Sequence, residues 1–418
     1  MPDEQKGVVV YELEPLTSPS AANPDWGFKA AAAVRAKAAS SVVHLALPPD
    51  PGPIAAAAAA GINGTAGGGV AATAAGNATL AVVKAAPLHA LAVADYGAGE
   101  VVLYGMHSSE RRAASVHGGN AGGSGPAGSG SGSGGLAVSE LQRLALPGVA
   151  SLARCRWGEQ LFLVALAFHH DKSYATTSAV YRWDSAAQQF TLLQELATSG
   201  AHGGRCFTLR DGAAPASGSA GGPPSPAAGS GDGAEGQSLF LAIANSRGAQ
   251  GDGFAANSTV WRFDPDAGRF LLHQAVPTVG AHDVQHVRLP AHGLRRAGGR
   301  RSGGGGAGGR GGLVDVLVFA NRGADEECSP SERSPLLVWH PRRQRWEEAA
   351  HMGLSCATGL ATTRLGTQQL LLATGDRAAN GSYAGPLTHL WRLEAEGLAA
   401  GVGAGEGAGS EGVRRDKV

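Results

Sequence analysis

Apolar residues recur along this chain in short runs separated by small or polar turns. The clearest unit is SLFLAIANSRG followed by STVWRFD (238–248 and 258–264). Apolar and polar positions alternate within these runs, β-branched and aromatic residues are enriched, and Gly, Pro, Asn and Asp flank them, as is typical of β-strands. One segment, AAAVRAKAASS (30–40), instead suggests a short helix.

This pair of strands occurs five times. The other copies are QLFLVALAFHHD with SAVYRWD (160–171, 178–184), VDVLVFANRG with PLLVWHP (314–323, 335–341), QQLLLATGD with LTHLWRLE (368–376, 387–394) and LHALAVADYG with EVVLYGM (88–97, 100–106). One further strand precedes each pair and another follows it. Four short strands in a repeat of about 50 residues are typical of a propeller blade. We therefore predict an all-β fold, a β-propeller of five to seven four-stranded antiparallel blades.

The third strand of each repeat carries an aromatic residue near its centre. These residues are Tyr104, Tyr181, Trp261, Trp339 and Trp391. Large aromatic side chains bury much apolar area, so we predict that they occupy one equivalent position and pack between neighbouring blades. Contact with a ligand is the alternative.

The start of the chain indicates an incomplete first repeat. GVVVYELE (7–14) resembles a third strand, and VVHLALPPDPGP (42–53) resembles a fourth strand. The chain is therefore predicted to begin inside a blade, with a C-terminal strand closing the ring.

Four stretches rich in Gly, Ala, Ser or Pro interrupt the repeats, and they account for much of the chain's 65 glycines. They lie at about 48–77, 108–135, 211–236 and 294–312. Such segments cannot repay their ordering entropy, which predicts disordered loops. We expect one propeller over 1–396 with these insertions, and a disordered tail at 397–418.

Charge and hydropathy restrict the class of protein. The chain has 34 basic and 34 acidic side chains, which argues against a nucleic-acid binder. No apolar run reaches the ~18 residues that cross a bilayer. The polar N-terminus MPDEQKGVVVYELE lacks the features of a signal peptide, which favours a cytoplasmic protein or a start that lies upstream.

Four N-x-S/T sequons favour the opposite location, because they are acceptors of N-linked glycans in secreted proteins. They begin at Asn63, Asn77, Asn257 and Asn380. We expect an extracellular or cell-surface glycoprotein, and a cytoplasmic location is the alternative.

The four cysteines form no CxxC pair, which argues against a zinc site. Cys155 and Cys206 occupy matching places in consecutive repeats. Two buried thiols are the simpler interpretation, because free cysteine is commonly buried. A disulfide would need Cα atoms within ~7 Å, and it stays open at this point.

Three groups of residues could bind ions. His169, His170 and Asp171 could ligate a transition metal, although adjacent residues rarely converge on one ion. Asn245, Asn321 and Asp376 could offer oxygens to calcium, but turn formation explains them more simply. We predict no metal site and no cofactor, with calcium as the alternative.

Two basic groups could bind other ligands. One is a glycine-rich tract that could contact RNA but contains no aromatic residue to stack on bases (Arg295, Arg296, Arg300, Arg301 and Arg310). The other is a set on the first strands of the repeats that could draw an acidic ligand into the central opening (Arg154, Arg205, His286 and Arg364). We interpret the tract as a solvated loop, and the first-strand set equally well as exposed turn residues.

The repeats resemble the epilepsy-associated repeat, also called EAR or EPTP. The residues that carry the resemblance are LFLAIAN (239–245), STVWRFD (258–264), FLLHQAVPTVGAHD (270–283), and SAVYRWD with FTLLQELATSGAH (178–184, 190–202). The match is good over about 155–290 and weaker elsewhere. The resemblance implies a seven-bladed extracellular propeller that binds receptor ectodomains, as in the leucine-rich glioma-inactivated proteins.

No nucleophile-elbow signature or carboxylate pair is present. We therefore predict a non-enzymatic protein-interaction module whose loops on one face bind a partner protein, such as a receptor ectodomain. An intracellular scaffold is the second hypothesis. A propeller hydrolase or lyase is the third.

Overall fold

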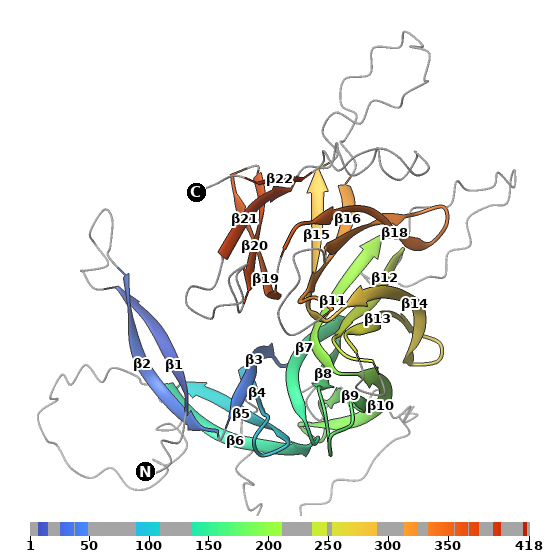
Figure 1. Ribbon diagram of the computed structural model, residues 1–418. Coiled ribbons are helices and arrows are strands. Elements are labelled where there is room, and N and C mark those ends of the chain that lie inside the picture. The colour runs from blue at the N-terminus through green and yellow to red at the C-terminus, as the bar shows by residue number, and fades with distance from the viewer. Residues whose placement is uncertain are drawn as a thin grey trace, which may run out of the picture. The chain divides into compact units, whose positions relative to one another are not determined.

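The computed structural model describes residues 7–15, 26–36, 38–48, 89–108, 136–210, 236–248, 253–290, 313–324, 333–354, 356–366, 368–375, 388–393 and 413–415. The described residues form β-strands and turns, with no helix among them (Figure 1). They also contain no helix that is long and apolar enough to cross a membrane. The predicted all-β class is thus confirmed.

The strands form one two-stranded sheet and five four-stranded sheets. Each four-stranded sheet is an antiparallel meander in chain order, which is the form of a propeller blade. The prediction of four-stranded propeller blades is confirmed, and the described residues form five of them. We call the four strands of each blade a, b, c and d in chain order.

The chain divides into two compact units. The first comprises Met1–Leu144 and Trp183–Thr191, and the second comprises Ala145–Arg182 and Leu192–Val418. The strands of the first sheets are β1 (Gly7–Pro15), β2 (Trp26–Arg35), β3 (Ala39–Ala46), β4 (His89–Asp95), β5 (Glu100–Ser108) and β6 (Leu136–Ala145).

Four blades follow in the chain. Their strands are β7 (Val149–Trp157), β8 (Gln160–Ala167), β9 (Ala175–Asp184) and β10 (Gln189–Ser199); β11 (Ala201–Arg210), β12 (Gln237–Asn245), β13 (Ala255–Asp264) and β14 (Arg269–Val279); β15 (Ala281–Pro290), β16 (Leu313–Asn321), β17 (Ser334–His340) and β18 (Arg345–Met352); and β19 (Ala357–Leu365), β20 (Gln368–Gly375), β21 (Thr388–Leu393) and β22 (Val413–Arg415).

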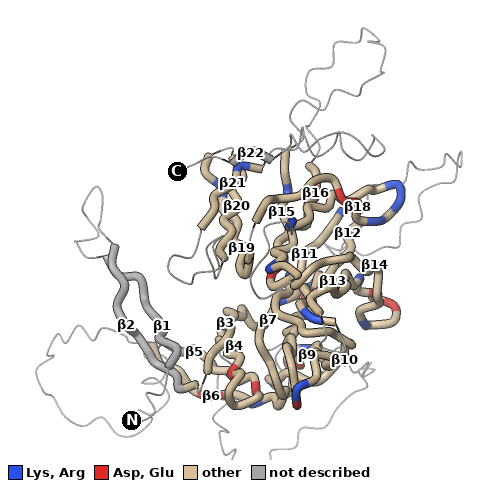
Figure 2. Tube along the Cα trace, viewed as in Figure 1, with Lys and Arg blue, Asp and Glu red and all other residues tan. Residues whose placement is uncertain are grey.

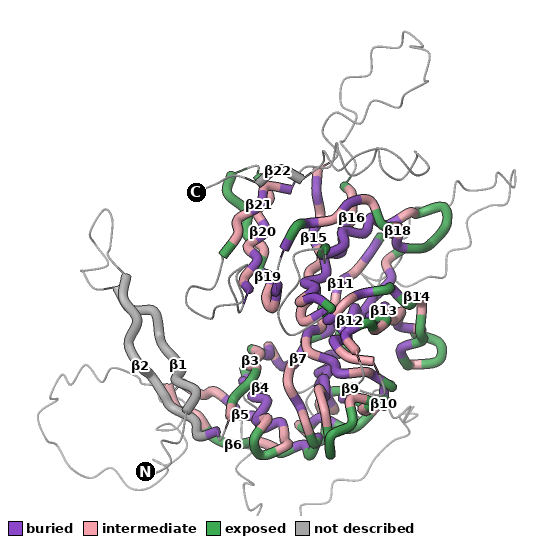
Figure 3. The backbone as a smooth tube through the Cα atoms, viewed as in Figure 1, coloured by how far each residue is buried: buried purple, intermediate pink, exposed green. Residues whose placement is uncertain are grey.

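The first strands of these four blades are neighbours. Strand β7 lies against β11, β11 against β15, and β15 against β19. Both faces of the sheets are covered near these strands. The b strands β8, β12 and β16 are therefore buried over most of their length (Figure 3). For example, Phe240 and Leu241 are 1% and 0% exposed although successive residues point to opposite faces.

Three apolar clusters fill the spaces between these blades. Phe162 of β8 packs with Leu241 of β12, Phe240 of β12 packs with Phe319 of β16, and Val318 of β16 packs with Leu371 of β20. Because β12 and β16 each contribute to a cluster on either side, their sequences are runs of apolar residues rather than alternations.

A glutamine on strand d connects consecutive blades. The side chain of Gln194 accepts a hydrogen bond from the N–H of Phe270 and donates one to its carbonyl, both at 2.8 Å. Gln274 makes the same pair of bonds to Trp346 at 2.8 and 2.9 Å, and Gln142 makes it to Phe190. We call this arrangement the glutamine clamp. Strand d is the edge of its sheet, so these backbone groups on its outer side have no neighbouring strand. The glutamine of the preceding blade is their hydrogen-bond partner.

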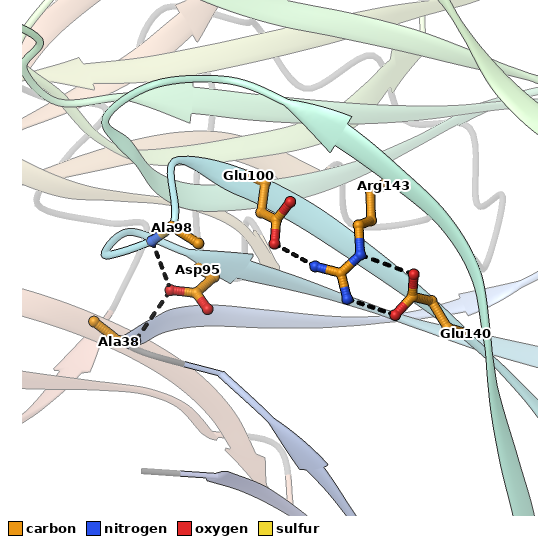
Figure 4. Close-up of polar contacts among 6 residues, drawn as sticks. All are labelled: Ala38, Asp95, Ala98, Glu100, Glu140 and Arg143. Carbon is orange, nitrogen blue, oxygen red and sulfur yellow. Dashed lines mark hydrogen bonds and ion pairs between the residues drawn. The ribbon is translucent and has the colours of Figure 1, made fainter. Parts of the chain in front are cut away.

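The first unit contains the blade β3–β6, in which buried Asp95 ends the b strand. Oδ1 of Asp95 accepts hydrogen bonds from the N–H groups of Ala38 and Ala98 at 3.0 and 3.1 Å (Figure 4). Arg143 of β6 forms ion pairs with Glu140 and with Glu100 of β5. These contacts join strands a, c and d of the blade.

Long connections in the blades share one location. The residues between β3 and β4, β11 and β12, and β15 and β16 join strands a and b, whereas those between β5 and β6 and between β21 and β22 join strands c and d. In an antiparallel meander these connections lie at the same end of the sheet. The connections from b to c and from d to the next a, at the opposite end, have 12 residues or fewer. Apart from Pro48, Ser108 and Gly236, the predicted insertions lie outside the described residues.

Three predictions near the chain ends were wrong. Residues 30–40 form the end of β2 and the start of β3 rather than a helix, because β2 pairs with β1 and β3 with β4. The segment at 42–53 is predicted to be a strand d, but its residues 42–46 belong to β3, which is strand a of the first blade. The predicted tail at 397–418 includes β22, which pairs with β21 and supplies the fourth strand of the last blade.

Candidate functional site

Glycines shape the turns that lead from one blade to the next. Gly200 and Gly280 follow strands β10 and β14 with φ angles of 59° and 61°, a conformation that glycine adopts without strain. A histidine follows two residues later in each case. These turns therefore place His202 and His282 at equivalent positions at the start of β11 and β15.

The two histidines stack on each other. Their ring centroids are 4.1 Å apart and the ring planes meet at 13°. Phe168, in the connection from β8 to β9, also contacts His202, with ring centroids 4.1 Å apart and an angle of 50° between the planes. A column of three rings from three consecutive blades therefore lies at the end of the sheets where b joins c.

Two arginines complete this group. The guanidinium of Arg247 lies 3.7 Å from the ring centroid of Phe254 and 5.4 Å from that of Tyr174. The guanidinium of Arg322 lies 5.9 Å from the centroid of Phe254. Cations at these distances are attracted by the face of an aromatic ring. We define the histidine–arginine cluster as Phe168, Tyr174, His202, Arg247, Phe254, His282 and Arg322.

The surroundings keep both imidazoles neutral. Burial, the neighbouring His282 and the two arginines lower the pKa of His202 to about 3. Burial and the same arginines lower the pKa of His282 to about 4. At neutral pH the cationic groups of the cluster are therefore the guanidiniums, which favour carboxylate, sulfate or phosphate groups and bind them with paired hydrogen bonds.

Serines on strand c fix the connections that carry the cluster. The N–H groups of Ala167, Asn245 and Asn321, at the ends of three b strands, donate to serine Oγ atoms at 3.1, 3.2 and 3.0 Å (Ser178, Ser258 and Ser334). In two blades the serine also bonds to a threonine of strand d at 2.8 Å (Thr198 and Thr278). The Ser and Thr of the repeat pattern thus anchor the loops.

The residues considered as metal ligands do not converge. His170 and Asp171 form an exposed ion pair at 3.0 Å, and His169 contacts Phe168 and Tyr174. The described residues contain no group of three or more His, Cys, Asp or Glu side chains that could hold a metal ion.

The asparagines considered as calcium ligands instead bond to the backbone. Nδ2 of Asn245 donates to the carbonyl of Asn257, and Nδ2 of Asn321 donates to that of Arg333. Asp376 lies outside the described residues.

The basic set on the first strands does not form one ring of equivalent residues. Arg154 and His286 share a register position, since they pair with Leu163 and Leu317, whereas Arg205 and Arg364 pair at other positions. His286 lies between blades, stacked on Phe207 at 4.3 Å and bonded to Asp315 at 2.9 Å. The arginines at 295–310 lie outside the described residues.

Cys155 and Cys206 form a disulfide with Cα atoms 5.2 Å apart, so the thiol interpretation was wrong. Their positions also differ by one residue, because Cys155 pairs with Phe162 whereas Cys206 pairs with Leu241. A shift of one residue turns a side chain to the opposite face. The two sulfurs can therefore meet in the space between adjacent blades. Cys356 is disulfide-bonded as well.

The aromatic residues of strand c occupy two positions rather than one. Tyr104, Tyr181, Trp261 and Trp391 each pair with a leucine of strand b (Leu91, Leu163, Leu241 and Leu371). In the third blade of the second unit Leu337 holds this position, and Trp339 lies two residues further on. Tyr104, Tyr181, Trp339 and Trp391 are buried, and Trp261 is half-buried in the cluster between β7–β10 and β11–β14.

Among the predicted glycosylation sites, Asn257 lies exposed on β13, while Asn63, Asn77 and Asn380 lie outside the described residues. The cluster residues themselves were not singled out from the sequence. The triplet Gly-Ala-His, which occurs at 200–202 and 280–282, is the signal that could have found them.

No protein-family model matches the chain. A Mus musculus protein named thrombospondin-type laminin G domain and EAR repeat-containing protein is 27% identical over 126 residues, which are 30% of this chain and 15% of the mouse protein. Among solved structures, Saccharomyces cerevisiae Sqt1 is similar with a TM-score of 0.37 and 9% identity, over 74% of this chain and 56% of Sqt1. A putative 6-phosphogluconolactonase of Bacteroides fragilis has a TM-score of 0.34 and 10% identity, over 70% of this chain and 65% of that one.

Proposed function

We propose that this chain is a non-enzymatic EAR/EPTP-like propeller that binds a partner protein through the histidine–arginine cluster. The observation that carries the proposal is the convergence of aromatic, histidine and arginine side chains from three consecutive blades at one end of the sheets. Aromatic residues and arginine dominate the energetics of protein interfaces. The match to an EAR repeat-containing protein supports the same class of module.

The chemistry of the cluster defines the partner segment. Arg247 and Arg322 both lie near Phe254, so an acidic side chain can approach two guanidiniums above one apolar ring. The neutral histidines and Phe168 provide an apolar, uncharged base beside the guanidiniums, which suits an apolar or aromatic side chain. We propose that the partner presents an exposed loop in which a carboxylate lies beside an aromatic or aliphatic residue.

We propose that the protein acts outside the cytoplasm. Disulfides persist in oxidising compartments and are rare in the cytosol, and Cys155, Cys206 and Cys356 are all disulfide-bonded. The exposed sequon at Asn257 agrees with this location. Release of a glycan from Asn257 by a glycosidase, in protein purified from its native source, would support the location, and free thiols at Cys155 and Cys206 in that protein would contradict it.

The binding proposal can be tested with a charge-reversed double variant. The wild type and Arg247→Glu/Arg322→Glu are screened against a library of purified cell-surface ectodomains by biolayer interferometry. We expect at least one ectodomain to bind the wild type and to lose more than about 100-fold in affinity with the variant, since two buried charge-assisted contacts are reversed.

Arg269 provides the matched control. It is the exposed first residue of β14, directly after the turn that joins strands c and d. In an antiparallel meander that turn lies at the end of the blade opposite to the connection from b to c that carries Arg247. Figure 2 shows red and blue segments, which mark acidic and basic residues, at the turn beside β14. Arg269→Glu reverses one arginine charge, half the change made in the double variant, and should leave binding within about threefold. Equal losses in both variants, or binding that survives in the double variant, would refute the assignment of this face.

A further inference from the structure

We propose that His44 and His89 form a surface site for a zinc ion on the blade of the first unit. Nε2 of His44 and Nδ1 of His89 are 3.2 Å apart. Neutral imidazole nitrogens are common ligands of zinc, with Zn–N distances near 2.0–2.1 Å. The site lies in the β3–β4 strand pair, outside the propeller unit that holds the histidine–arginine cluster.

The register of the strands explains why the two rings meet. Ala46 of β3 pairs with His89 of β4, and His44 precedes Ala46 by two residues on the same face. His44 and His89 are therefore a diagonal cross-strand pair, which long and aromatic side chains can bridge. The small side chain of Ala46 leaves room for His89 to extend toward His44. Their ring centroids are 5.1 Å apart, with an angle of 27° between the planes.

The separation of the nitrogens suits chelation. Two nitrogens bound at 2.0–2.1 Å to a tetrahedral ion lie roughly 3.3–3.4 Å apart. The observed 3.2 Å is close to this value, so binding requires only a small rotation of the rings. The ion takes the place of the proton that the two nitrogens otherwise share, and protonation of either ring competes with it.

Solvent completes the coordination. Both histidines are exposed, so an ion can reach them and keep water ligands. The described residues supply no third His, Cys, Asp or Glu ligand. Zinc sites with open positions are those that exchange ligands or accept a donor from another molecule. The site therefore fits a bridging ion that a histidine or carboxylate of a second protein could complete.

Isothermal titration calorimetry of the full chain with zinc chloride at pH 7.5 tests the proposal. We expect His44→Gln and His89→Gln each to remove one zinc equivalent, or to weaken that site at least tenfold. The matched control is His107→Gln on the same sheet, because Nε2 of His107 bonds to Oγ of Ser139 rather than to another histidine. This control should bind as the wild type does.

A second measurement keeps the test valid if a variant is less stable. Copper(II) added to the wild type at one equivalent should give an electron paramagnetic resonance spectrum with coupling to two imidazole nitrogens, and copper should bind more tightly than zinc. A wild type that shows only one nitrogen, or zinc binding that is equal in all four proteins, would show that the pair forms a hydrogen bond alone and would overturn the proposal.

Discussion

Removing a glutamine clamp should destabilise the second unit measurably. In Gln194→Ala, the N–H and the carbonyl of Phe270 lose their partners, each at 2.8 Å in the native protein. Phe270 is fully buried. Its neighbour within the sheet is Phe263 of β13, which lies on the side of β14 away from Gln194. Water can replace the lost bonds only incompletely.

The expected loss follows from the two bonds. A net contribution of about 1 kcal/mol for each hydrogen bond, plus a desolvation cost for buried groups left unpaired, gives about 2 to 4 kcal/mol. Gln194→Glu should lose at least as much at pH 7, because an anionic oxygen then faces the carbonyl oxygen of Phe270. Its carboxylate still accepts from the N–H of Phe270 but cannot donate to the carbonyl.

Urea denaturation followed by tryptophan fluorescence measures these differences, and hydrogen exchange should show faster exchange of the Phe270 amide. Gln189→Ala is the control, because this glutamine is exposed on the same strand and its loss should change stability by less than about 0.5 kcal/mol. The reasoning is refuted if Gln194→Ala lies within that range, or if the Phe270 amide exchanges as it does in the wild type.

Three other predictions rest on the blade junctions. Replacing Cys155 and Cys206 by serine should lower the free energy of unfolding by about 4 kcal/mol, since the bridge closes a loop with a sequence separation of 51; equal denaturation midpoints with and without the bridge would contradict this. His202 has a pKa of about 3 in the folded protein, so its unfolded form binds more protons below pH 6.5 and stability should fall as pH drops from 6.5 toward 3. His202→Phe should flatten this slope by up to about 1.4 kcal/mol per pH unit, and an unchanged slope in acid denaturation would disprove the burial of a neutral imidazole. Gly280→Ala should lower the melting temperature more than Gly268→Ala: both have positive φ, but an added Cβ lies 2.8 Å from a backbone oxygen only at Gly280; equal shifts in calorimetry would rule out this steric explanation.

The strands could be predicted because their apolar pattern follows directly from burial. Runs such as LFLAIAN (239–245) are buried on both faces. Many short apolar runs separated by turns are typical of repeated four-stranded blades. The prediction of one equivalent aromatic position failed at Trp339 because a shift of two residues leaves a side chain on the same face. The register of that strand is visible only in its backbone pairing with β16 and β18, and Ser334 at its start accepts a hydrogen bond from the N–H of Asn321.

The disulfide and the candidate site depend on contacts between blades, which periodicity within one repeat does not contain. Aligning the repeats placed Cys155 and Cys206 at the same position, although a shift of one residue is what brings them face to face. Similarly, the repeated triplet Gly-Ala-His marks His202 and His282 as equivalent but does not show that their rings meet. Their stacking depends on the angle at which one blade follows the next.

The location of the long connections has a consequence for how such a chain can change. Residues 211–236 and 291–312 join strands a and b, whereas the histidine–arginine cluster lies at the other end of the sheets, on connections of 12 residues or fewer. Insertions, deletions or fused reporter domains in the long connections leave the register and the serine anchors of the cluster intact. We therefore expect changes in loop length to be tolerated at one end of the sheets, and changes in binding chemistry to arise at the other.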